Sequence, residues 1–141
     1  HHEHVDARVG RHGDGCAVVG VQVVHAIPIR NDEAVEAVPE AHLTFLESRP
    51  TMWQRDGAIF VHAGIRPGVP LSDQKQSDMR WIREEFIDQR GDLEKVVVYG
   101  HTIYEDVEER GSRIGIDTGA YDSGKLTALA LEGGERWFLQ T

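Results

Sequence analysis

Two short apolar runs that each stop at a histidine constrain this chain more than any other feature. Residues 60–65 read FVHAGI and residues 97–102 read VVYGHT, so His62 and His101 each follow strand-forming residues and lie close to a glycine. Apolar runs without polar alternation are typical of strands in a sheet with both faces covered. In layered α/β proteins, ligands gather at the carboxyl ends of such strands. The pattern therefore favours an α/β fold with two histidines delivered to a shared site.

The remaining segments predict helices that give way to strands and turns in the last third of the chain. We expect strands over 17–24, 58–62, 95–99 and 113–117, helices over 39–48 and 78–87, and a terminal hairpin formed by 125–131 and 135–140. Gly133 and Gly134 are the expected turn of that hairpin. Ser77 is the expected cap of the second helix. Residues 64–77, rich in Gly, Pro, Ser and Asp, are expected to form a loop over a cleft.

The first of these helices carries the apolar residues Leu43, Phe45 and Leu46, which we expect to form its packed side. In the second, Met79, Ile82 and Phe86 recur at helical spacing and predict a buried face.

Composition narrows the class of protein. A chain of 141 residues with 40% hydrophobic and 28% charged residues is expected to be one globular domain. A net charge of −9 argues against a nucleic-acid groove, because phosphate backbones attract clustered Lys and Arg. We expect no membrane partner, since no apolar run approaches the length of a span. A single cysteine, Cys16, is typical of a reducing compartment, so a cytoplasmic location is expected.

Eight histidines are an unusual count and prompt a search for metal ligands. His62 and His101 are the candidate pair, because two imidazoles at neighbouring strand ends can reach one cation. Taken singly, each is also interpretable as a core histidine bonded to backbone. The cluster at residues 1–4 reads as a tag remnant or a frayed end. His25, His42 and Cys16 are expected to be structural, since none has a partner motif.

Two further residues are candidates for the site. Arg83 lies near the boundary of the buried face of its helix, where a guanidinium can hold a phosphoryl group through two parallel hydrogen bonds. The alternative is an exposed helix face with salt bridges. Asp117 ends a strand and can ligate metal, orient a histidine, or cap a turn. We favour the second or third role for it.

Four of these segments also resemble a known family. Val61-His62-Ala63-Gly64, Trp81-Ile82-Arg83, Tyr99-Gly100-His101-Thr102 and Ile116-Asp117-Thr118-Gly119-Ala120 are similar, in order and spacing, to motifs of the calcineurin-like metallophosphoesterases. The most similar branch is the bacterial serine/threonine phosphoprotein phosphatases and the diadenosine tetraphosphatase-like enzymes. The resemblance covers about residues 35–141. It implies the C-terminal part of a calcineurin-like β-sandwich flanked by helices, with mixed sheets.

The resemblance also implies a function. In that family two metal ions, manganese or else iron or zinc, bind a hydroxide that attacks phosphorus. The matching positions make His62 and His101 ligands of the second metal, Arg83 a holder of substrate phosphoryl oxygens, and Asp117 a supporting residue. The implied substrates are a phosphorylated protein or a dinucleoside polyphosphate.

The chain departs from the family in its first part. Three motifs that supply the first-metal ligands, the bridging aspartate and the general-acid histidine (Gly-Asp-x-His-Gly, Gly-Asp-x-x-Asp-Arg-Gly and Gly-Asn-His-Glu) do not occur in it. Residues 1–30 are therefore read as an atypical N-terminal segment and residues 31–141 as the phosphoesterase-like domain. No catalytic residue beyond the metal ligands is expected, and this chain alone is expected to have very low activity. The alternative is a non-catalytic module that binds metal or a phosphorylated ligand. Edge strands left bare by the missing part are expected to be covered either by the new N-terminal strand or by a second copy of the chain in a homo-oligomer.

Overall fold

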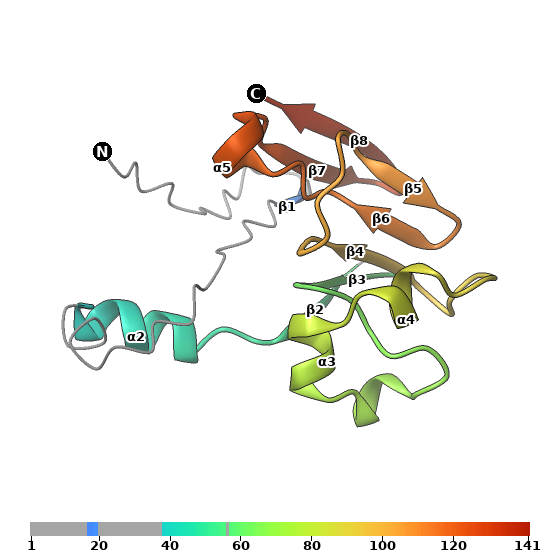
Figure 1. The fold of residues 1–141 in the computed structure, drawn as a ribbon, viewed down its shortest axis with the longest axis horizontal. Helices are drawn as coiled ribbons and strands as arrows, with labels where there is room; N and C mark the ends of the chain where they lie inside the picture. Colours follow the sequence, from blue (N-terminus) through green and yellow to red (C-terminus); the bar gives the residue numbers. More distant parts are fainter. Residues whose placement is uncertain (1–16, 20–37, 56) are drawn as a thin grey trace.

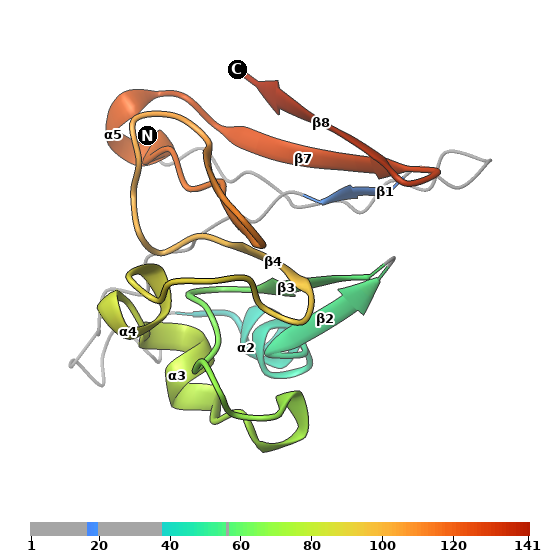
Figure 2. The ribbon, with the colours of Figure 1, turned by 90° about the vertical axis from the view of Figure 1, so that its right-hand side faces the viewer.

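The computed structural model describes residues 17–19, 38–55 and 57–141. In chain order the elements are β1 (Ala17–Val19), α2 (Glu40–Glu47), β2 (Met52–Arg55), β3 (Ala58–Val61), the short 3₁₀ helix η1 (Leu71–Asp73), α3 (Gln76–Trp81), α4 (Glu84–Ile87), β4 (Val96–Tyr99), β5 (Glu108–Arg110), β6 (Arg113–Gly115), α5 (Ala120–Ser123), β7 (Thr127–Glu132) and β8 (Glu135–Gln140). Two sheets lie one above the other, and α3 and α4 lie on the far side of one of them (Figures 1 and 2). The predictions for residues 1–16, for the rest of the first strand, for His25 and for a domain boundary at residue 30 fall outside the described residues.

The larger sheet has five strands in the order β2-β3-β4-β6-β5. Its three central strands β3, β4 and β6 run parallel, and β2 and β5 pair antiparallel at the edges. Every residue of β3 and the last three of β4 are buried. Such strands need cover on both faces, which explains why their sequences show no polar alternation. The parallel pairing brings the carboxyl ends of β3 and β4 to the same end of the sheet.

The smaller sheet is antiparallel, in the order β1-β7-β8. In its hairpin Glu132 pairs with Glu135, and the two residues between them, Gly133 and Gly134, have φ angles of 57° and 89°. Positive φ at both central positions of a two-residue turn requires glycine in practice. The predicted terminal hairpin is confirmed, and its turn is the predicted Gly-Gly pair.

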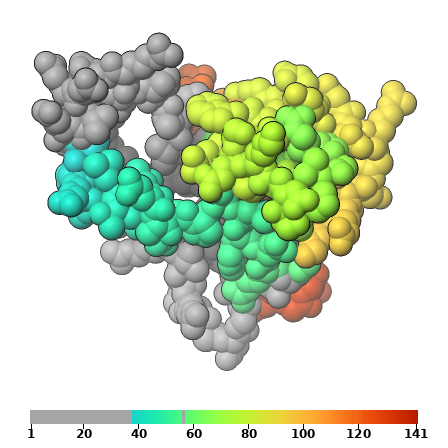
Figure 3. All heavy atoms as spheres, turned by 90° about the horizontal axis from the view of Figure 1, so that it is seen from below, coloured from blue at the N-terminus to red at the C-terminus, as the bar shows by residue number. Residues whose placement is uncertain are grey.

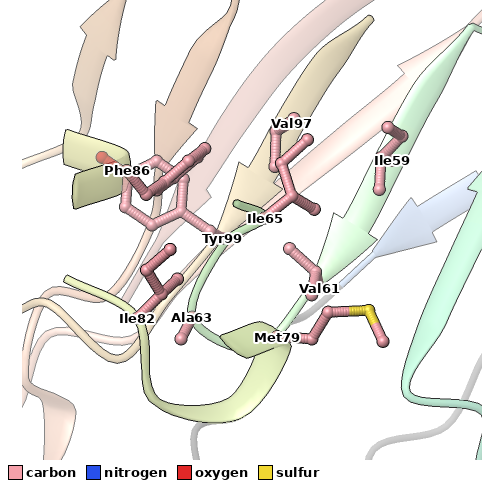
Figure 4. Close-up of a cluster of buried hydrophobic side chains, with 9 residues drawn as sticks. All are labelled: Ile59, Val61, Ala63, Ile65, Met79, Ile82, Phe86, Val97 and Tyr99. Carbon is pink, nitrogen blue, oxygen red and sulfur yellow. The ribbon is translucent and has the colours of Figure 1, made fainter. Parts of the chain in front are cut away.

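The larger sheet carries one apolar core on each face. The core under α3 and α4, drawn in Figure 4, consists of Ile59, Val61, Ala63, Ile65, Met79, Ile82, Phe86, Val97 and Tyr99. The core that faces the smaller sheet consists of Ala58, Phe60, Val98, Ile114, Ile116 and Leu129. Alternate residues of β3 enter opposite cores, as the two-residue period of a strand requires. Each fully buried large side chain contributes about 1.5–3 kcal/mol, so both layers hold the central strands in place.

The helix predicted over 78–87 is divided in the structure. α3 ends at Trp81, Ile82 has extended backbone (φ −61°, ψ 144°), and α4 begins at Glu84. The corner turns α4 onto the sheet, where the ring of Phe86 packs edge-on against Tyr99 with 5.0 Å between centroids. Tertiary packing thus overrides local helix propensity. Ser77 lies inside α3, whose N-cap residue is Lys75 without a side-chain cap bond, so the predicted cap is wrong.

α2 agrees with the helix predicted over 39–48, but its predicted packed side is wrong. Phe45 and Leu46 are 53% and 57% exposed, and no residue of α2 is buried. In the space-filling view α2 extends to one side of the segments that carry α3 and α4 (Figure 3). Among the described helices none is long and apolar enough to cross a bilayer.

Candidate metal centre

His62 and His101 lie side by side at the end of the larger sheet. Each follows directly, or within one residue, the last residue of a central strand, β3 or β4. The backbone N–H of Gly100 donates to the carbonyl oxygen of His62 at 2.8 Å, which joins the two strand ends. The imidazole centroids are 5.0 Å apart and the ring planes are inclined by 54°. The sequence expectation that both histidines reach one place is therefore met, whereas their role as ligands stays a prediction.

The backbone at His101 is unusual. His101 is the one non-glycine residue with positive φ (67°) in the part of the chain that the structure describes. The N–H of Thr102 donates to the carbonyl oxygen of Gly100 at 2.7 Å and closes a three-residue turn around it. Turns of this type with positive φ at the centre are rare and strained. A buried side chain (5% exposed) held this way costs about 1–3 kcal/mol, and such strain clusters at functional sites.

Small residues after His62 let the helices approach closely. The N–H of Ala63 donates to the carbonyl oxygen of Met79 in α3 at 2.8 Å. A Cβ atom at Gly64 would lie 2.5 Å from the ring of Phe86 in α4, so only glycine fits without displacement. The Ala-Gly pair therefore fixes α3 and α4 against the turn that carries the first histidine.

Trp81 also belongs to this site, although no role of its own was predicted for it. Its ring stands edge-on to the ring of His101, with centroids 5.7 Å apart and planes inclined by 85°. It is nevertheless 62% exposed. The signal available in the sequence was a large aromatic residue outside the predicted buried face of Met79, Ile82 and Phe86. Trp81 packs against His101 on the side where the chain leaves α3.

Arg83 lies two residues further on, between α3 and α4. Its carbonyl oxygen accepts hydrogen bonds from the N–H groups of Phe86 and Ile87, each at 2.9 Å, which starts α4. The residue is half-buried. Within the described residues its guanidinium forms no hydrogen bond or ion pair, unlike Arg66 and Arg113. Arg83 thus has donors available for an anion. The alternative of an exposed helix face with salt bridges needs one continuous helix, but the helix breaks between Arg80 and Glu84.

The loop between the first histidine and α3 is held by a bidentate ion pair. The Nε and Nη2 atoms of Arg66 bond Asp78 Oδ2 and Oδ1 at 2.7 and 2.9 Å. These hydrogen bonds from the guanidinium lower the pKa of the Asp78 carboxyl below its usual value. Gln74 adds bonds to the backbone N–H and carbonyl of Arg66. The predicted loop over 64–77 is therefore tied at both ends, with η1 inside it.

Asp117 lies two residues beyond β6 and closes a turn. Its Oδ1 accepts the backbone N–H of Gly119 at 3.0 Å, and its carbonyl oxygen accepts the N–H of Tyr104 at 2.9 Å. Of the roles left open by the sequence, this contact is the turn-capping one. Support of a histidine by Asp117 stays a prediction.

The side-chain ligands present at the site determine how many metal ions it can bind. A separation of roughly 5 Å between ring centres fits two imidazoles that share one cation at ligand distances of about 2.0–2.1 Å. The described residues contain no group of three or more His, Cys, Asp and Glu side chains placed to hold an ion. Two nitrogen donors fit one cation with an incomplete set of protein ligands. They do not fit a two-metal centre.

Comparison with known proteins supports the fold. No family model matches the chain, and no curated protein matches it. Its fold is similar to the crystal structure of a "putative diadenosine tetraphosphatase", with a TM-score of 0.60 and 19% sequence identity. The match covers 77% of this chain and 58% of that chain, so the chain corresponds to little more than half of the solved structure. The expected mixed α/β architecture is confirmed. The likeness shows the fold alone, and membership of the calcineurin-like metallophosphoesterases stays a proposal.

Proposed function

We propose that this chain binds one divalent cation between His62 and His101 as part of a phosphoester hydrolase centre. One observation carries the proposal: two histidines from adjacent parallel strands meet with ring centroids 5.0 Å apart, and one of them has a strained backbone. The resemblance to the calcineurin-like metallophosphoesterases makes manganese the ion we propose, with iron and zinc, which imidazole nitrogens suit, as the alternatives.

Arg83 supplies the second part of the proposed site. A half-buried guanidinium whose donors are not used by the described residues is suited to two parallel bonds with phosphoryl oxygens. Its place two residues after Trp81, which packs on His101, supports a position beside the cation. In this proposal Arg83 binds and orients the phosphoryl group, and the histidines hold the cation.

The residues present supply part of a hydrolytic centre. When bound, a divalent cation can lower the pKa of a coordinated water and stabilise charge on a phosphoryl oxygen. The chain supplies two imidazoles for that cation, but the three first-metal motifs do not occur in its 141 residues. We therefore expect phosphoester hydrolysis by this chain alone to stay near background.

The proposed substrate carries a phosphoester or phosphoanhydride. The similar solved structure is described as a "putative diadenosine tetraphosphatase", and this supports a dinucleoside polyphosphate as the substrate of this chain. A phosphoserine or phosphothreonine protein is the other substrate class in the proposal. We also propose that two copies of the chain pair through a sheet edge to form a homo-oligomer.

A second candidate function is a non-catalytic module that binds metal or a phosphorylated ligand. The observation that favours it is the donor set, because the described residues bring together no third ligand. In this version His62, His101 and Arg83 keep their binding roles, and only turnover is absent.

Metal content measured by elemental analysis tests the proposal. Wild-type protein is compared with His62→Ala and His101→Ala, and His42→Ala on exposed α2 is the matched control. We expect one equivalent of manganese in the wild type and in the control, and loss in both site variants. Two equivalents would favour a complete enzyme centre. Equal metal content in all four proteins, or none in the wild type, would overturn the proposed site.

A further inference from the structure

A shallow pocket opens two residues after His101 along the chain. Its volume is about 440 Å³, within the range of small-molecule sites. The walls come from three segments: residues 103–105, residues 118–119 beyond β6, and α5 together with Lys125. The proposed cation site and Arg83 use none of these residues.

The pocket offers two exposed apolar surfaces. Ile103 is 45% exposed and Tyr121 is 81% exposed, and both line it. Gly119 lies beneath Ile103: a Cβ there would come within 2.9 Å of Ile103 Cγ2, and the φ of Gly119 is 63°. The glycine lets the isoleucine rest on the backbone of the turn, so this wall is closely packed. An exposed tyrosine ring and an aliphatic side chain together suit a flat, apolar ligand face.

Most polar groups of the pocket are already engaged within the wall. Thr118 Oγ1 donates to the carbonyl oxygen of Lys125 at 2.6 Å, and Ser123 Oγ donates to that of Thr118 at 2.7 Å. The ammonium of Lys125 donates to the carbonyl oxygen of Glu105 at 2.6 Å and joins two walls. The carboxylates of Glu105 and Asp122 form no hydrogen bond or ion pair with the described residues. The pocket therefore offers the carboxylates of Glu105 and Asp122 as acceptors, and its lysine, Lys125, is already engaged. This set of groups is unsuited to a phosphate.

We propose that this pocket binds the nucleobase of a nucleotide substrate. Base rings stack on exposed aromatic side chains, and Tyr121 supplies the stacking surface. The exocyclic amino group of a base such as adenine donates hydrogen bonds, which the carboxylates of Glu105 and Asp122 can accept. The inference rests on the proposed function in one respect: the phosphate of the same nucleotide extends toward His101 and Arg83. It selects a nucleotide over a phosphoprotein as the substrate class.

The test measures adenosine and AMP binding by isothermal titration calorimetry, with ribose 5-phosphate as the control that lacks a base. Proteins are the wild type, Tyr121→Ala and Tyr121→Phe, the last keeping the ring without the hydroxyl. We expect AMP to bind roughly 5- to 100-fold more tightly than ribose 5-phosphate, as stacking of one base predicts. Tyr121→Ala should remove that advantage and Tyr121→Phe should keep it. Because the side chain of Tyr121 is exposed, we expect both variants to fold like the wild type, and circular dichroism checks this.

Adenosine separates this inference from the proposed function, because it carries no phosphate and its binding needs no metal. Adenosine binding that depends on the Tyr121 ring, in a protein that binds no manganese, would leave the base pocket standing and overturn the cation site. Manganese binding without adenosine binding, or equal adenosine affinity in wild type and Tyr121→Ala, would overturn the base pocket alone.

Discussion

The hydrogen bond from the Gly100 N–H to the His62 carbonyl oxygen, 2.8 Å long, joins the two strand ends that carry the histidine pair. It extends the parallel pairing of β3 and β4 beyond their last residues. Because the bond is between backbone atoms, the sheet itself sets the distance between the two backbone positions that carry the imidazoles. The sheet thus preorganises the site.

The His101→Gly variant should have a more stable fold than the His101→Ala variant. Both His101→Gly and His101→Ala remove the imidazole, so they lose the same packing against Trp81 to a first approximation. Only alanine must keep a Cβ at φ 67°. We expect His101→Gly to exceed His101→Ala by about 1 kcal/mol in free energy of unfolding, measured by urea titration. Equal stability would show that the turn relaxes and stores no strain.

Alanine at position 64 should disturb the packing of α4. A Cβ at Gly64 meets the ring of Phe86 at 2.5 Å, and we expect a loss of about 1–3 kcal/mol from overpacking. Gly57→Ala is the matched control, because Gly57 also has positive φ (78°) but open space around its Cβ position. The comparison by chemical denaturation isolates the clash. If Gly64→Ala loses no more free energy of unfolding than Gly57→Ala, the close contact between position 64 and the Phe86 ring would be contradicted.

How much of this could be read from the sequence depends on the kind of interaction. The central strands and the hairpin could be predicted, since apolar runs bounded by glycine signal them directly. β2 and β5 could not, because edge strands such as MWQR and EER are short and polar. The break at Ile82 arises from packing of Phe86 against a distant turn.

The location of the site was predictable from the sequence, but its detailed geometry was not. Two strand-end histidines indicated a shared location, and parallel pairing provides it. The strained backbone was not predictable, because the adjacent glycine is the residue expected to take positive φ, yet His101 takes it. The edge-on contact of Trp81 also depends on the corner after α3.

Arg83 should govern phosphate affinity without governing metal affinity. Charge-assisted bonds are worth about 1.5–3 kcal/mol, so Arg83→Ala should weaken binding of inorganic phosphate to the manganese-loaded protein by roughly 10- to 100-fold. Arg80→Ala is the control, since Arg80 is an exposed arginine of α3. Titration calorimetry reports both affinities. Equal effects of the two variants on phosphate binding would remove Arg83 from the site.

Acid should release the loop that follows the first histidine. The pKa of Asp78 is lowered by its hydrogen bonds from Arg66, so the folded state binds the proton less readily than the unfolded state. Stability from this pair is present above the unfolded pKa of about 3.9 and is lost as the pH falls through the lower folded value. We expect Asp78→Asn to flatten the pH dependence of the urea midpoint below about pH 4. An unchanged pH profile would show that the pair contributes nothing to stability.

The central claim is that His62 and His101 hold the same cation, and paramagnetic broadening by Mn²⁺ tests it most directly. The chain has eight histidines, whose imidazole resonances can be followed by NMR during a manganese titration. We predict that the signals of His62 and His101 broaden first and together, and that His101→Ala protects His62 from broadening. Broadening that begins at the histidines of residues 1–4, with the His62 and His101 signals unaffected, would contradict the account.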